Sequence, residues 1–197
     1  MQYADFQEDF PDFGNWGINS GQQGDGPPTE PIFFRREAFT CIDRGGYLLD
    51  NETGYIASWI RLRDLHSGKD LHVTNTHLTH FGSEKRRAQL MKILRQTQGD
   101  VSQLLMGDLN SIQNGPELQL LLQEGWADTY AAVHGPVRQP GTNHAFCDAV
   151  RDPDHAKVDW IFSKGDWKFS DAEVIRERKN GFPASDHYFV SACGSIH

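Results

Sequence analysis

Four short motifs contain the residue types in this sequence that could do chemistry. Each combines a carboxylate, an amide or an imidazole with apolar neighbours. They are NTH with Asn75 and His77, GDLN with Asp108 and Asn110, VDW with Asp159, and SDH with Asp186 and His187. Each motif alone also has a purely structural interpretation, since Asp and Asn favour turns and a strand can turn one side chain to solvent. Together in one chain, they predict a shared polar site.

The chemistry that this set could share is the attack of water on a phosphate ester. An Asp–His pair makes a general base, because the carboxylate orients the imidazole and stabilises its cation. An asparagine amide can donate to a phosphoryl oxygen or orient the water. Carboxylate and amide oxygens also suit Mg²⁺, a hard cation that neutralises charge as it builds on the phosphate.

The motifs fall at the ends of, or within, apolar segments that we expect to be strands. Alternation in ASWIRLRDL, the turn HSGKD and the segment LHVTNTHL predict a hairpin. VSQLLM is typical of a buried strand that ends just before Asp108, and KVDWIF, EVIRE and YFVSAC are typical of later strands. We expect one helix from Ser83, as its cap, to about Gln98, and another from Pro116 to Gly125.

Length and composition favour one soluble domain over residues 1–197, with an irregular segment at residues 1–30. The net charge of −8 argues against a broadly basic surface but not against a phosphate substrate, because a cation held by carboxylates makes a site electropositive. Neither an apolar run long enough to span a membrane nor a signal peptide is present. The odd count of three cysteines argues against a disulfide framework, and we expect buried free thiols.

The ordered set NTHL, GDLN, VDWIF and SDH resembles the endonuclease/exonuclease/phosphatase superfamily, which has the DNase I-like fold. The resemblance runs from about Pro31 to Ala192, most of the chain. It implies an α+β protein built as a four-layer αββα sandwich, with the active site at one edge of the packed sheets.

The resemblance also implies a role for each catalytic residue. His77 would contact the scissile phosphate and serve as general acid. Asp108 and Asn110 would position the attacking water and the phosphate. Asp159 would bond to His187, which would be a base or a phosphate stabiliser.

A divalent cation, Mg²⁺ or Mn²⁺, is the cofactor that the resemblance implies. Its ligands would come from Asp108, Asn110 and Asp186, together with Glu8 from the N-terminal segment. Among the polar and basic residues outside this set, we expect substrate contacts from Arg35 and Asn75.

The sequence departs from the superfamily at its beginning. Members open with a core strand that ends in an asparagine, followed by a strand that leads to a metal-binding glutamate, usually in a QE pair. Gln7–Glu8 can match the glutamate, but the first strand and its asparagine have no counterpart, so the fold is expected to be N-terminally shortened. We expect the aromatic residues of segment 1–13 to fill part of the vacated core. A second copy that pairs along an exposed sheet edge is the other solution.

The favoured function is a Mg²⁺-dependent phosphodiester hydrolase, a nuclease that acts on DNA in preference to RNA, without a membrane partner. A phosphatase or phospholipase-like enzyme for a small or lipid phosphoester is the first alternative, because the shared motifs report the reaction and not the substrate. An inactive binding module is the second. A Ser–His–Asp acyl hydrolase is disfavoured because no GxSxG motif is present.

Overall fold

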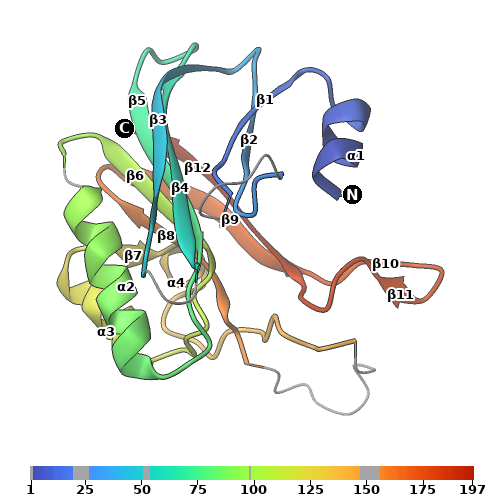
Figure 1. Ribbon diagram of the computed structural model, residues 1–197. Coiled ribbons are helices and arrows are strands. Elements are labelled where there is room, and N and C mark those ends of the chain that lie inside the picture. Colours follow the sequence, from blue (N-terminus) through green and yellow to red (C-terminus); the bar gives the residue numbers. More distant parts are fainter. Residues whose placement is uncertain (1, 20–26, 51–53, 98, 147–155) are drawn as a thin grey trace.

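A six-stranded sheet forms the centre of the computed structural model, which describes residues 2–19, 27–50, 54–97, 99–146 and 156–197 (Figure 1). In spatial order, its strands are β3 (Phe39–Leu48), β4 (Ile56–Asp64), β5 (Asp70–His77), β6 (Ser102–Asp108), β8 (Asp159–Lys164) and β7 (Ala127–Asp128). β4 and β5 are antiparallel, which confirms the predicted hairpin. β5 and β6 are parallel, and α2 (Ser83–Gln96) lies between them in sequence.

The register of the sheet places three of the predicted site residues side by side. His77 of β5 pairs with Asp108 of β6, and Asp108 pairs with Asp159 of β8. Gly107 makes the close approach of β5 and β6 possible, since a Cβ there would lie 1.9 Å from the carbonyl oxygen of Thr76. Its φ of +128° is also one that L side chains rarely adopt.

One face of the sheet is covered by α2 and α3 (Pro116–Gln123), whereas α4 (Thr129–His134) lies beside β7 and β8 and contacts β9. Alternation along the strands turns large apolar side chains toward this face, where they meet the apolar stripes of the helices. The resulting core comprises Leu105, Trp160 and Phe162 of the strands and Leu90, Ile93, Leu118 and Leu121 of the helices. This core fixes the ends of β6 and β8, which carry the two aspartates.

The other face of the sheet is covered by two separate two-stranded ribbons. β1 (Phe13–Trp16) pairs with β2 (Ile32–Arg35), and β9 (Trp167–Ile175) pairs with β12 (Phe189–Ile196). The first ribbon packs on β4 and the second on β8, so that β5 and β6 lie between them. The DNase I-like α+β sandwich is therefore confirmed, with its second sheet divided in two. Pairing of two copies along a ribbon edge stays a prediction.

The N-terminal segment differs from the prediction that residues 1–30 are irregular. It forms α1 (Gln2–Asp9) and β1 (Phe13–Trp16), whereas residues 20–26 lie outside the described part. Nor do its aromatic side chains fill the space between the ribbons. The rings of Tyr3 and Phe6 contact Phe33 of β2, with centroids 5.6 and 4.1 Å away. Strand alternation turns Phe33 away from Ile32 and Phe34, which belong to the core beneath β2, so α1 covers the outer side of this ribbon.

Three local features also differ from expectation. Ser83 is the first residue of α2 and its hydroxyl bonds to Glu117, so it does not cap the helix. Cys41 and Cys193 are free thiols but exposed, and Cys147 lies outside the described residues. A hairpin of β10 (Arg178–Lys179) and β11 (Phe182–Pro183), which the sequence did not reveal, precedes the SDH motif.

In the described part of the chain, no helix has the length and apolar character needed to cross a membrane.

Candidate active site

The GDLN motif forms a tight turn that aims its polar groups at β5. Asn110 has a left-handed backbone with φ of +46°, and its amide nitrogen donates to Asp108 Oδ1 at 2.8 Å. Asn residues tolerate this conformation better than most, because their short side chain bonds locally. The Asn110 side-chain amide donates to the carbonyl oxygen of Leu78 at 2.8 Å. The turn is thereby tied to the residue that follows His77.

His77 Nε2 lies between an acceptor and a donor. Asp108 Oδ2 is 3.3 Å away and Asn110 Nδ2 is 3.1 Å away. A protonated Nε2 can donate to the carboxylate, and an unprotonated Nε2 can accept from the amide. The imidazole therefore keeps a partner in both protonation states, which suits a group that transfers a proton.

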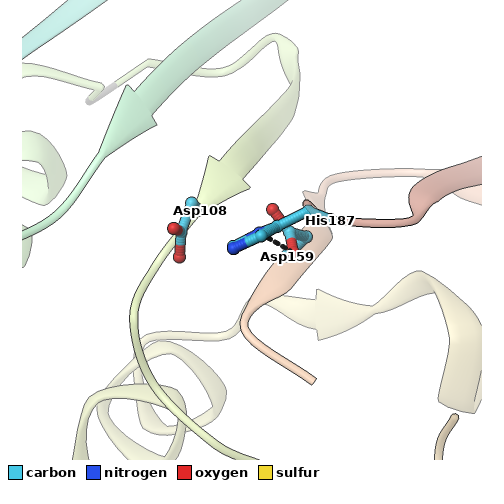
Figure 2. Close-up of side chains that lie close together, drawn as sticks. All are labelled: Asp108, Asp159 and His187. Carbon is cyan, nitrogen blue, oxygen red and sulfur yellow. Dashed lines mark hydrogen bonds and ion pairs between the residues drawn. The ribbon is translucent and has the colours of Figure 1, made fainter. Parts of the chain in front are cut away.

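Asp159 and His187 form a hydrogen-bonded pair across the two layers. His187 Nδ1 lies 2.8 Å from Asp159 Oδ2, and the two side chains are only 22% and 17% exposed (Figure 2). The loop of His187 is held by the backbone, because the amides of His144 and Ala145 both donate to the carbonyl oxygen of Asp186 at 3.0 Å. The predicted Asp–His pair is thus present, with His187 presented beside Asp108.

A cavity of about 500 Å³ opens over β5 and β6, between the two ribbons. The predicted residues on its wall are Asn75, His77, Asp108, Asp159, Asp186 and His187. Apolar side chains of Met106, Ile161 and Val190 complete part of the lining. The four motifs, far apart in sequence, therefore converge on one cavity whose wall combines these polar groups with apolar side chains.

Glu30 is an acidic group of this site that the sequence did not reveal. It precedes Pro31, the residue before β2, and the carbonyl oxygen of Pro31 accepts a hydrogen bond of 3.0 Å from Asn75 Nδ2. Burial, and next the charge of Asp108, raise the pKa of Glu30 from 4.5 to about 7. The sequence TEP before the apolar segment IFF places Glu30 just ahead of a strand, but no local pattern marks its closeness to Asp108.

Asp108 itself is held in an environment that disfavours its charge. Burial raises its pKa above the ordinary value, and the nearby Asp159 adds to the effect. The amide of Asn110 and the imidazoles of His77 and His187 act in the opposite direction. Carboxylates in this state would be stabilised by a cation.

Two predicted residues do not reach the site. Glu8 is exposed on α1 and neither lines the cavity nor belongs to the group that could hold a metal ion. Arg35, at the end of β2, pairs with Glu37 at 3.4 Å and stacks over the ring of Phe13, and it does not line the cavity. Asn75 does line it, but its amide nitrogen binds the backbone of the β2 ribbon.

The group that could hold a cation comprises Asp108, Asp159 and His187, which each offer a ligand atom within 4.8 Å of the others (Figure 2). The two carboxylates suit Mg²⁺ or Mn²⁺, whereas an imidazole is a more usual ligand of softer cations, so Asp108 and Asp159 are the members of this group that would hold the ion. Burial raises the pKa of Asp108, and a cation would stabilise its ionised form. The residues present therefore fit a divalent cation. Asp186 lines the same cavity but is not part of this group, and Asn110 lies beside it, with its side-chain amide nitrogen 3.1 Å from His77 Nε2.

Comparison with known proteins gives a likeness in structure without a detectable likeness in sequence. No family model and no curated protein matches the chain. The endonuclease/exonuclease/phosphatase from Bacteroides vulgatus superposes on 100% of this chain and 81% of its own, with a TM-score of 0.84 and 22% identity. The mannosyl-6-phosphatase of Bacteroides thetaiotaomicron superposes on 99% of this chain and 81% of its own, with a TM-score of 0.83 and 19% identity.

A third similar structure is TDP2 from D. rerio in complex with a single-strand DNA product. It superposes on 99% of this chain and 82% of its own, with a TM-score of 0.77 and 15% identity. At these identities, the likeness establishes the fold, which is the DNase I-like fold of endonuclease/exonuclease/phosphatase proteins. What the site does with this fold follows from its own residues.

Proposed function

Starting from a chain with the DNase I-like fold, we propose that it hydrolyses phosphate esters with the help of a divalent cation. The observation that carries the proposal is the convergence of Asp108, Asp159 and His187 on one cavity wall, with His77 at hydrogen-bond distance from Asp108. The order in the sheet, His77 beside Asp108 beside Asp159, gives the cluster a rigid base.

His187 is the proposed base for the attacking water. Its Nδ1 is engaged by Asp159, so a neutral ring keeps its proton on Nδ1 and presents an unprotonated Nε2. When Nε2 takes the proton from water, the Asp159 carboxylate stabilises the imidazolium that results. The pair therefore acts as a unit, and Asp159 both orients and stabilises the base.

His77 is the proposed acid on the other side of the cluster. With a proton on Nε2 it can give that proton to the departing oxygen of the ester and then accept from Asn110 Nδ2. Asp108 holds the protonated ring in place beforehand. Proton removal at His187 and proton delivery at His77 thus occur at separate groups, and proton exchange with solvent restores both rings after each turnover.

Asp108 and Asp159 are the proposed carboxylate ligands of the cation, with Glu30 and Asp186 close enough to the site to assist. Mg²⁺ or Mn²⁺ bound there would neutralise phosphate charge and lower the pKa of a bound water. The part of this chain is to gather and partly bury these carboxylates, whose own repulsion the cation would relieve.

The substrate we propose is a nucleic-acid phosphodiester, with DNA in preference to RNA. The likeness to TDP2, whose structure holds a single-strand DNA product, supports this choice. A phosphatase that acts on a sugar phosphate is the second candidate. It is favoured by the higher TM-score against the mannosyl-6-phosphatase and by a net charge of −8, which weakens attraction to a polyanion.

A substrate panel tests both the proposed hydrolysis of phosphate esters and the proposed choice of substrate. The protein would be incubated with single-stranded DNA, duplex DNA, RNA, mannose 6-phosphate and p-nitrophenyl phosphate, each with Mg²⁺ and with EDTA. His187→Ala protein serves as the matched control for contaminating hydrolases. Hydrolysis of DNA above the control, lost in EDTA, supports a nuclease. Release of phosphate from the sugar ester alone supports the second candidate, and inactivity on every ester contradicts the proposed function.

A further inference from the structure

A row of aromatic rings leads from His77 to the surface. The ring of Tyr55 lies edge-on to His77 with centroids 5.5 Å apart, and its hydroxyl is 3.1 Å from His80 Nδ1. The ring of His80 lies over that of Phe81 at 3.7 Å. We call Tyr55, His80 and Phe81 the aromatic row. Each residue of the row contacts the next, and its first member, Tyr55, contacts His77 of the proposed active site.

The loop that carries His80 and Phe81 is anchored to the same site. The amide of Leu78 donates to the carbonyl oxygen of Asp108 at 2.9 Å, and that of Phe81 donates to Thr79 Oγ1 at 3.1 Å. Thr79 is completely buried, and its own amide donates to Gln89 Oε1 at 2.9 Å. These bonds hold the backbone that carries the two exposed rings in one position relative to Asp108.

Phe81, the last residue of the aromatic row, has an exposed ring on an anchored loop. Phe81 is 58% exposed, although its backbone is fixed by buried partners. A single exposed apolar side chain needs no explanation, and Leu65, 53% exposed in the turn at the opposite end of β4 and β5, is such a case. Phe81 differs because a chain of contacts connects it to His77. Its outer face is available to a flat ligand beside the site.

We propose that the aromatic row is a stacking site for a nucleobase of the substrate, next to the phosphate that is cleaved. The inference rests on the proposed phosphodiesterase function and names the substrate class as a nucleic acid strand with an unpaired base. Bases of single strands stack on aromatic side chains irrespective of sequence, because every base has a π-face. The row would therefore position the strand without reading its sequence.

Binding of a fluorescent strand tests the stacking site separately from hydrolysis. The probe is a short single-stranded DNA that contains 2-aminopurine, whose emission is quenched when it stacks. Measurements use protein with His187→Ala and Mg²⁺, so that the cation is present while turnover is slow. On this background, Phe81→Ala is compared with Phe81→Trp and with Leu65→Ala, the control of similar exposure at the other end of the strands.

We expect Phe81→Ala to weaken binding about 5- to 150-fold, the range for loss of one base–aromatic stack, and to abolish the quenching. Phe81→Trp should keep both properties, and Leu65→Ala should change neither. A strand with abasic sites in place of its bases should bind equally to protein with and without Phe81→Ala. Unchanged melting temperatures would show that the exposed substitution leaves the fold intact.

The proposal is overturned if Phe81→Ala binds and quenches like its parent, if the parent binds no strand, or if the substitution impairs mannose 6-phosphate hydrolysis instead. Other results would contradict the proposed hydrolysis independently of the stacking site. Base-dependent binding without hydrolysis of any ester by the unsubstituted protein would leave the stacking site in place and remove the enzyme. DNA hydrolysis with the same KM after Phe81→Ala would keep the enzyme and remove the stacking site.

Discussion

Replacing Glu30 by Gln should change how the stability of the protein depends on pH. Glu30 sits beside Asp108 at the start of the β2 ribbon, and burial followed by the charge of Asp108 raises its pKa from 4.5 to about 7. The folded protein thus binds this proton more tightly than the unfolded chain does. Below pH 4.5 the Glu30 carboxyl is protonated in both the folded and the unfolded state, so it does not reduce the free energy of unfolding. As the pH rises from 4.5 through about 7, the unfolded chain releases this proton more readily than the folded protein, and stability is lost.

The magnitude follows from the two pKa values. Their difference corresponds to about 3 kcal/mol of stability lost above pH 7, an upper figure because the carboxyl is only partly buried. Gln cannot ionise, so Glu30→Gln should show none of this loss. A bound divalent cation should reduce the loss in the unsubstituted protein, since it favours the ionised carboxylate.

Urea unfolding at pH 5 and at pH 8 measures the effect. Both proteins would be studied in EDTA and again in Mg²⁺, and the change in unfolding free energy between the two pH values would be compared. Taking the difference between variants removes the contribution of groups that they share. Between pH 5 and pH 8 in EDTA, the unsubstituted protein should lose up to about 2.5 kcal/mol more than Glu30→Gln, because part of the loss has already occurred at pH 5. Equal losses in the two proteins would refute the burial of the Glu30 carboxyl beside the site.

Other substitutions test the remaining parts of the site. Asp159→Ala and His187→Ala should each reduce kcat by about 10²-fold or more, and the double variant should be little worse, because the two act as one unit; multiplicative losses would mean that they act independently. Chelation by EDTA should abolish hydrolysis, and added Mg²⁺ or Mn²⁺ should restore it, so full activity after exhaustive chelation would exclude the cation. Glu8→Gln should leave activity and its Mg²⁺ dependence unchanged, since Glu8 is exposed on α1, and a marked loss in metal titrations would show that it reaches the site.

The elements of the central sheet were predictable because its strands obey simple rules. Ile56, Ile60 and Leu62 alternate with polar neighbours, and both β4 and its turn to β5 lie where alternation and the HSGKD turn place them. Strand ends then bring His77 and Asp108 together, because β5 and β6 are parallel and their carboxyl ends share one edge. Local pattern and short-range topology were sufficient here.

Residues of the second layer were harder to place, because their positions depend on contacts between distant segments. Glu30 stands in a Gly- and Pro-rich stretch whose composition indicates only a loop, and its proximity to Asp108 results from the packing of β2 over the sheet. Glu8 matched a motif by its QE pair, yet α1 lies on the outer side of the ribbon. Neither outcome is encoded in a short pattern around the residue.

The contacts among Tyr55, His80 and Phe81 were also not predictable from the sequence. None of the three stands in a motif of its own. They are connected by ring contacts and one hydrogen bond between a hairpin and a loop. His80 and Phe81 directly follow the NTHL motif, so their distance from His77 along the chain was known, but the direction of the rings was not.

The hydrogen bond between His187 and Asp159 joins two parts of the protein that should differ in resistance to heat. Asp159 belongs to the six-stranded sheet, whereas His187 lies two residues before β12, which belongs to a ribbon of only two strands. Two-stranded ribbons are marginal alone and open locally at a lower free-energy cost than a sheet with a full core. Warming should therefore separate His187 from Asp159 while the sheet is still folded, so that the proposed hydrolytic activity is lost reversibly before the protein melts. A ligand that contacts both layers would bind only the closed form and would raise the temperature of inactivation more than that of melting.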